Sequence, residues 1–270
     1  MKKREIIWLI AVSVIVTTSV MAYNDFESNE KQFAGDAIEK FTNLSDIDMQ
    51  LIGHLSTNLG TFEIYQSDTS FYYINSESNR VEGAIFIESP DQLKTVRLTQ
   101  YDAQQKAQQF AIDHYNRFTE KNFQLINAEL IDHGDGGIEY LFIWREFIQS
   151  TGTPNIVQIS VNPESGKILS YIGIQRDIKV SVLPKITEDE AIEYALTCFP
   201  KLYLKRESIP AYLSVEYITP GTQSLTWTVI IKHEWIELQS ISFDQMEYSN
   251  GGIVVIDAQT GKVLLKDMWR

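Results

Sequence analysis

The residue types that could carry chemistry are scattered along this chain, and none falls into a spacing that builds a reactive site. His233 and Glu234 are adjacent, but a zinc-binding helix would need a second histidine three residues further on. The segment from Asp132 to Asp135 lacks the ordered oxygen ligands of a calcium site. Cys198 has no partner pattern for a nucleophile, and no Gly-x-Ser-x-Gly elbow occurs. The sequence therefore predicts a protein that is not an enzyme, with no catalytic residue, metal site or cofactor.

Two Gly-Lys pairs, which begin at Gly166 and Gly261, invite comparison with a phosphate-binding loop. That comparison fails because the other glycines of such a loop are missing and a strand, not a helix, is expected after each pair. The pairs belong instead to a phrase that the chain repeats at residues 74–81, 161–168 and 256–263. Each copy reads apolar, Asn or Asp, two residues, Ser or Thr, Gly or Asn, a base, and a β-branched residue.

Each copy of the phrase predicts a β-hairpin turn. Apolar, β-rich runs flank it, and the Asn or Asp side chain opens the turn by bonding its own backbone. Gly or Asn near the end of the turn tolerates a positive φ. The copies lie about 90 residues apart, which indicates tandem units and not the shorter period of a solenoid.

A second signature marks the helices that must pack on these hairpins. Residues 99–107 and 187–195 both begin with Thr, place an acid three residues later, and carry Ala at positions four residues apart. The Thr and the acid are typical of a capping box, and the small Ala residues would let the helix lie close on a sheet. The first unit keeps only a remnant, Asp36-Ala37 with Phe41.

The strands follow each helix. In the second unit they are expected at about 123–131, 138–148 and 155–161, and in the third at about 212–219, 224–233 and 252–256. The predicted fold class is α+β, with each unit a helix packed on a short antiparallel β-sheet.

These residues resemble the PepSY domain, the module of thermolysin-type propeptides and of a bacterial membrane protein linked to spore germination. The resemblance rests on Thr187–Ala195, on the closing Val254–Val263, and on Trp227-Thr228-Val229 in the middle strand. It implies PepSY-like units at 96–180 and 181–270 and a degenerate one at 31–95. It also implies a non-catalytic, extracytoplasmic module that regulates or inhibits peptidases and other envelope enzymes.

The N-terminus predicts export. Residues 2–4 are all basic, and residues 6–22 are an almost unbroken apolar stretch. Residues 1–22 therefore read as a signal peptide or a membrane anchor, and the sequence leaves both open. In either case the remainder is expected outside the cytoplasm, membrane-anchored or secreted.

The net charge of −13 at pH 7 disfavours nucleic acid and anionic lipid as partners and would suit a basic protein surface. Contact with a membrane is expected only through residues 6–22, if they are not cleaved.

The aromatic residues divide into an expected core and an expected contact surface. Alternation along a strand places Tyr140, Phe142 and Trp144 on one face, where most such residues are buried. The long connection at 233–251 carries apolar residues that suggest a lid or a contact surface. Its candidate partner-binding residues are Trp235, Ile236, Leu238, Phe243 and Tyr248.

The sequence thus predicts an exported, PepSY-like regulatory protein that binds an envelope or secreted peptidase or a cell-wall enzyme. One variant of this hypothesis is a propeptide-like inhibitor acting in trans on a metallopeptidase. A different hypothesis is a structural or sensory domain that signals through a membrane partner, which requires an uncleaved anchor.

Overall fold

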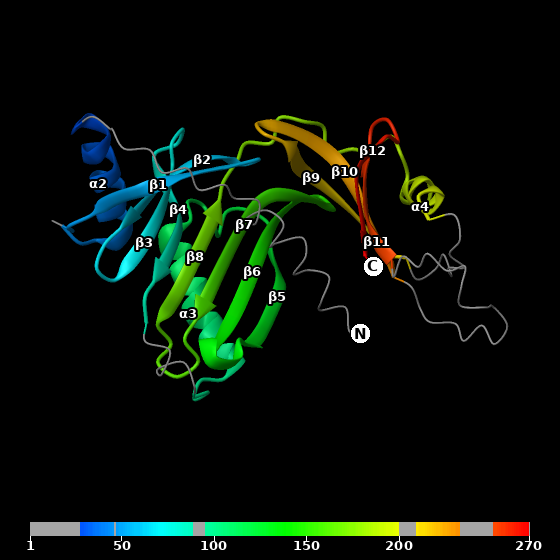
Figure 1. The fold of residues 1–270 in the computed structure, drawn as a ribbon. Helices are drawn as coiled ribbons and strands as arrows, with labels where there is room; N and C mark the ends of the chain where they lie inside the picture. Colours follow the sequence, from blue (N-terminus) through cyan, green and yellow to red (C-terminus); the bar gives the residue numbers. More distant parts are fainter. Residues whose placement is uncertain (1–27, 46, 89–94, 200–208, 233–250, 270) are drawn as a thin grey trace, which may run out of the picture. The chain divides into compact units, whose positions relative to one another are not determined.

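The computed structural model describes residues 28–45, 47–88, 95–199, 209–232 and 251–269, in a mixed α+β fold (Figure 1). The expected signal or anchor segment, 1–22, lies outside these residues. Among the described residues there are three α-helices, one short 3₁₀ helix (Gly134–Gly136) and twelve strands. None of these helices is both long and apolar enough to span a membrane.

The described residues form two compact units. The first takes in the chain up to Phe147, together with Pro154–Arg176 and Thr219–Gly221. The second takes in Ile148–Thr153, Asp177–Ile218 and the chain from Thr222. The ranges predicted for the first two repeats, 31–95 and most of 96–180, thus lie in one compact unit, whereas most of 181–270 lies in the other.

The first unit contains two successive sets of one helix followed by four antiparallel strands. The first set is α2 (Ser28–Thr42), β1 (Gln50–Thr57), β2 (Gly60–Gln66), β3 (Ser70–Asn75) and β4 (Arg80–Phe86). The second set is α3 (Gln100–His114), β5 (Phe123–Asp132), β6 (Ile138–Ile148), β7 (Thr151–Val161) and β8 (Ile168–Ile174). The last strands of the two sets, β4 and β8, pair antiparallel, so the strand order is β1-β2-β3-β4-β8-β7-β6-β5. The sequence had predicted only a hairpin and a short helix in the first set, and β1 and β2 are additional.

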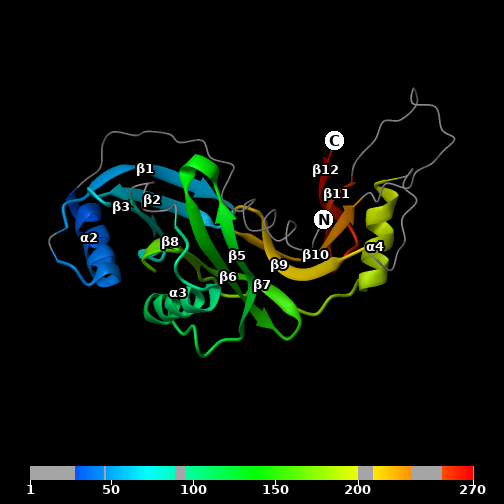
Figure 2. The same cartoon turned by 90° about the horizontal axis from the view of Figure 1, so that it is seen from below.

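Both helices of this unit lie on the same side of its sheet (Figure 2). Ala103, Ala107 and Ala111 of α3 are fully buried, as the small-residue stripe predicted, because a methyl side chain lets the helix backbone approach the strands. The strands present Tyr140, Phe142 and Trp144 to the same core, which confirms that these aromatic residues share one face.

The second unit repeats the pattern once. It consists of α4 (Glu188–Thr197), β9 (Ala211–Thr219), β10 (Thr222–Lys232), β11 (Gly251–Asp257) and β12 (Val263–Trp269), with strand order β9-β10-β11-β12. Ala191 and Ala195 pack on Trp227, Val229 and Val254, among others. The predicted capping box is confirmed, since the Thr187 hydroxyl accepts from the Glu190 N–H and the Glu190 carboxylate accepts from the Thr187 N–H.

The repeated phrase forms the same turn in all three copies. Asn75 Oδ1 accepts the N–H groups two and three residues ahead at 3.0 and 2.9 Å. Asn162 does so at 2.8 and 3.0 Å, and Asp257 at 2.9 and 2.8 Å. The residue that needs a positive φ is Asn79 (51°), Gly166 (75°) or Gly261 (75°). The turn prediction is therefore confirmed in geometry as well as in position.

Asp257 offers a direct test of this turn. Asp257→Ala is expected to lower the free energy of unfolding of the second unit by about 1–2 kcal/mol, because two backbone N–H groups lose their acceptor. Asp257→Asn should cost less than about 0.5 kcal/mol, since Asn keeps that oxygen and fills the same place in the other two copies. Denaturant unfolding of the two variants checks this, and equal losses would contradict it.

Candidate functional site

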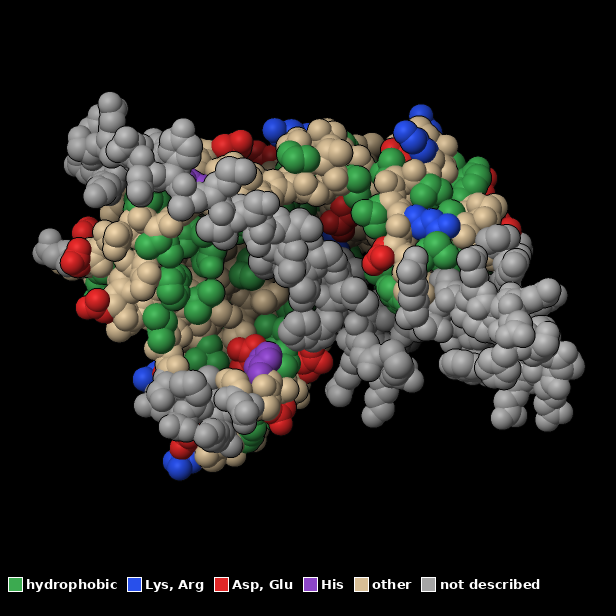
Figure 3. All heavy atoms as spheres, in the orientation of Figure 1, with side chains coloured by type: hydrophobic (Ala, Val, Ile, Leu, Met, Phe, Trp, Pro, Cys, Tyr) green, Lys and Arg blue, Asp and Glu red, His purple; other side chains and the backbone are tan. Residues whose placement is uncertain are grey.

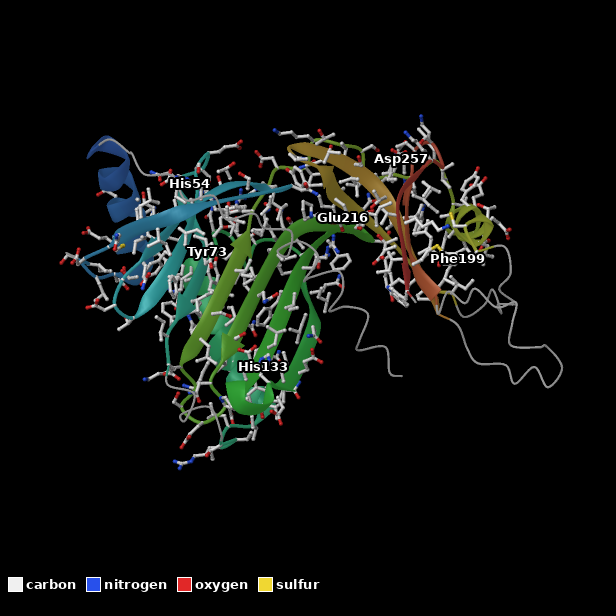
Figure 4. All side chains as sticks on the ribbon, viewed as in Figure 1. His54, Tyr73, His133, Phe199, Glu216 and Asp257 are labelled. Carbon is white, nitrogen blue, oxygen red and sulfur yellow. The ribbon has the colours of Figure 1, made fainter. Side chains whose placement is uncertain are left out.

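The residues that the sequence nominated as a contact surface, Trp235, Ile236, Leu238, Phe243 and Tyr248, lie in 233–250, outside the described residues. His233 lies there too. The other histidines lie on different elements. His54 is in β1, and His133 follows β5 (Figure 4) and lies 3.2 Å from Glu139. His114 ends α3. Within the described part of the chain, no group of three or more His, Cys, Asp or Glu side chains could hold a metal ion.

A hollow of about 430 Å³ on the first unit is lined mainly by apolar side chains. It lies on the sheet face opposite α2 and α3, and hydrophobic side chains gather over β3 and β4 on this face (Figure 3). We call it the apolar groove. Its main lining residues are Leu55, Phe62, Ile64, Tyr73, Ile172 and Ile174.

Strand alternation explains why the groove exists. In β3, Tyr72 and Ile74 point to the helix-side core, so Tyr73 between them points to the opposite face. In β8, Tyr171 packs in the helix-side core, whereas Ile172 belongs to the groove cluster. Both strands are apolar on their two faces, which is unusual for an antiparallel sheet with one face in water. That two-sided apolar pattern was the sequence signal that could have located the groove.

One charged side chain, Glu82, belongs to the groove lining and is almost fully buried. Arg176 binds it with two parallel hydrogen bonds, at 2.6 Å to Oε1 and 2.8 Å to Oε2. Arg176 also donates to the Leu59 carbonyl in the β1–β2 turn. Burial raises the pKa of Glu82, and the hydrogen bond and charge of Arg176 oppose that rise. Because the carboxylate is already paired, the groove presents an apolar surface and not a free charge.

The phenol of Tyr73, on the groove side of β3, is a hydrogen-bond donor at neutral pH. Burial raises the pKa of Tyr73. A raised phenol pKa keeps the proton on the oxygen. The groove therefore presents apolar side chains and a protonated phenol.

Comparisons with known proteins place few constraints on this site. No family model matches the chain, and no curated protein matches it. Among solved structures, the Bacillus megaterium YpeB C-terminal domain is similar to it, with a TM-score of 0.45 and 13% sequence identity. That similarity covers 90% of this chain and 98% of the other.

Proposed function

We propose that this chain is a non-catalytic, exported, PepSY-like binding protein whose apolar groove takes an apolar segment of a protein partner. The partner class is an envelope or secreted peptidase or a cell-wall enzyme. The observation that carries the proposal is the groove, because it is concave, apolar and neutralised at its one carboxylate. Apolar hollows of this size in exposed sheet faces are typical binding sites.

The PepSY-like part of the proposal is supported by contacts that two sets of elements share. In the second set, the Pro163 carbonyl accepts from the N–H groups of Arg97 and Leu98, just before the cap of α3. In the second unit, the Ala258 carbonyl accepts from the N–H groups of Lys185 and Ile186, just before the cap of α4.

In both copies, a buried aromatic residue of the middle strand also donates a hydrogen bond to the segment just before the helix. Tyr140 donates to the Leu98 carbonyl at 3.0 Å, and Trp227 donates to the Ile186 carbonyl at 2.8 Å. The same turn, helix start and middle strand are therefore joined in the same way twice, which supports tandem copies of one module.

A capture experiment with matched variants tests the proposed function. Ile85 lines the groove and is 42% exposed, whereas Leu130 on β5 is 46% exposed and is not part of the lining. Tagged full-length protein and Leu130→Asp are expected to retain a near-stoichiometric peptidase or wall hydrolase from gently solubilised envelopes. Ile85→Asp is expected to lose it, because a carboxylate would have to be buried against apolar surface. Retention by both variants, or by neither, would contradict the groove as the binding surface.

A further inference from the structure

In the first unit, two copies of the repeat are joined edge to edge through their last strands, β4 and β8. The paired residues are Gly83 with Ile172, Ala84 with Tyr171, and Ile85 with Ser170. Ala84 and Tyr171 hold the same place in the two copies, three residues after the repeated phrase ends. A strand that meets its own equivalent about a two-fold axis has a self-complementary edge, so a second copy of that strand fits it in the same way.

Apolar side chains hold this junction together on both faces of the sheet. On the helix side, the ring of Tyr171 lies 5.4 Å from that of Phe41 in the other copy, measured between ring centres. Phe41 also lies 6.1 Å from the ring of Phe110 on α3. On the opposite side, Ile85 and Ile172 both line the apolar groove. The junction therefore depends on two consecutive apolar residues of each closing strand, one on each face.

β12 is the closing strand of the third copy, and it carries charges at these two positions. Lys266 holds the place of Tyr171, and Asp267 holds the place of Ile172. Both charged residues are exposed, and Leu265 just before them is 47% exposed. Among the described strands, β12 pairs with β11 alone. Charged residues on an apolar outer strand are a common means of keeping a sheet edge unpaired.

The helix beside β12 differs in the corresponding way. At the end of α4, Cys198 stands at the same distance from the capping Thr as Phe110 does in α3. Lys266 Nζ donates to the Cys198 carbonyl at 2.9 Å and lies 5.5 Å from the centre of the Phe199 ring. A hydrated lysine thus lies over the end of α4, at the place where the first unit has aromatic rings of two copies in contact.

A second molecule brought to β12 in the register of β4 and β8 would meet unfavourable neighbours. The two-fold axis would set Lys266 opposite its own equivalent once, and Asp267 opposite Leu265 twice. Like charges directly opposite each other destabilise a strand pair. A carboxylate set against an apolar side chain loses water and gains no partner.

We propose that β12 is the joining strand of the repeat and that Lys266 and Asp267 keep it from pairing with a second copy of this chain. The proposal goes beyond the proposed function, which concerns the groove of the first unit. It explains why the repeats pair through closing strands once and not again.

Sedimentation velocity of the full-length protein in one mild detergent tests the proposal. The double variant Lys266→Tyr with Asp267→Ile gives β12 the two residues of β8. It is expected to form dimers and to associate at least about tenfold more tightly than the wild type, because three unfavourable cross-strand pairs are replaced. Lys266→Tyr alone should have an intermediate effect. Lys179→Tyr with Asp177→Ile makes the same changes at exposed positions of the second unit, away from this edge, and should sediment as the wild type does.

Hydrogen exchange shows whether the dimers use the proposed edge. Exchange of the β12 amides should slow with rising concentration in the double variant and stay constant in the wild type. Three results would overturn the proposal: a double variant that sediments as the wild type does, dimers with unchanged β12 exchange, or wild-type β12 exchange that slows with concentration. Thermal unfolding shows that each variant is folded, and Lys266→Tyr, which changes one exposed residue, provides the same test if the double variant does not fold.

Discussion

An Arg176→Met variant is expected to lose about 3–5 kcal/mol of unfolding free energy, because Glu82 would stay buried without its partner. The side chains of Arg176 and Glu82 are 14% and 4% exposed, so water cannot replace the lost contact. Arg176 also joins the two sets of elements in the first unit. Its backbone bonds the Asn155 side chain, and its guanidinium reaches the Leu59 carbonyl in the β1–β2 turn.

The unfolding free energy that Arg176→Met loses should become smaller as the pH falls. Burial raises the pKa of Glu82 and Arg176 opposes this, so removing Arg176 raises that pKa further. A carboxyl group whose pKa is higher in the folded protein than in the unfolded chain stabilises the folded protein at pH values below the unfolded-state pKa. This contribution is lost as the pH rises through the folded-state pKa. The difference between wild type and variant should therefore shrink on acidification. A difference that stays constant with pH would contradict this account.

Two further variants separate the buried pair from a general effect of losing an arginine. Glu82→Gln with Arg176→Met removes both charges and should recover much of the loss. Arg97→Met breaks the exposed pair with Glu164, whose Arg side chain is 69% exposed, and should cost less than about 1 kcal/mol. Denaturant unfolding of the four proteins under one buffer gives the comparison.

The local features of this fold could be predicted from the sequence because their causes are local. The turn that begins at Asn162 and the cap at Thr187 each depend on residues within a few positions along the chain. The alternation that buries Phe142 with Tyr140 is equally local.

The pairing of β4 with β8 could not be predicted, since no short pattern marks which strand edges meet. Val81, Ile168 and Val263 hold the same place in the repeated phrase, and the residues three positions after them are Ala84, Tyr171 and Lys266. Ala84 and Tyr171 are paired opposite each other, so the two closing strands meet about a local two-fold axis. Lys266 donates instead to the Cys198 carbonyl, and a lysine at this place is typical of a strand edge that stays unpaired.

The apolar groove depends on that non-local pairing. Ile172 meets the residues of β2 and β3 in the apolar groove only because β8 lies beside β4. The sequence therefore identified the repeated elements, and it could not identify a site that forms where two of them join.

A Phe142→Ala variant is expected to lose about 3–5 kcal/mol of unfolding free energy from the first unit. Phe142 is fully buried beneath α3, and its ring centre lies 6.1 Å from that of Tyr140 and 6.0 Å from that of Trp144. Truncation leaves a cavity among large rings that cannot close around it. Leu125→Ala on β5, where the side chain is 37% exposed, should cost less than about 1 kcal/mol.

Hydrogen exchange is the informative measurement for this variant, because a chain of two units need not unfold in one step. Protection should fall in β6, β7 and α3, whose side chains share the core with Phe142. It should be unchanged in β10 and β11, whose buried residues belong to a separate cluster. Equal loss of protection in both units would mean that they unfold together, and the stability of the groove would then depend on the whole chain.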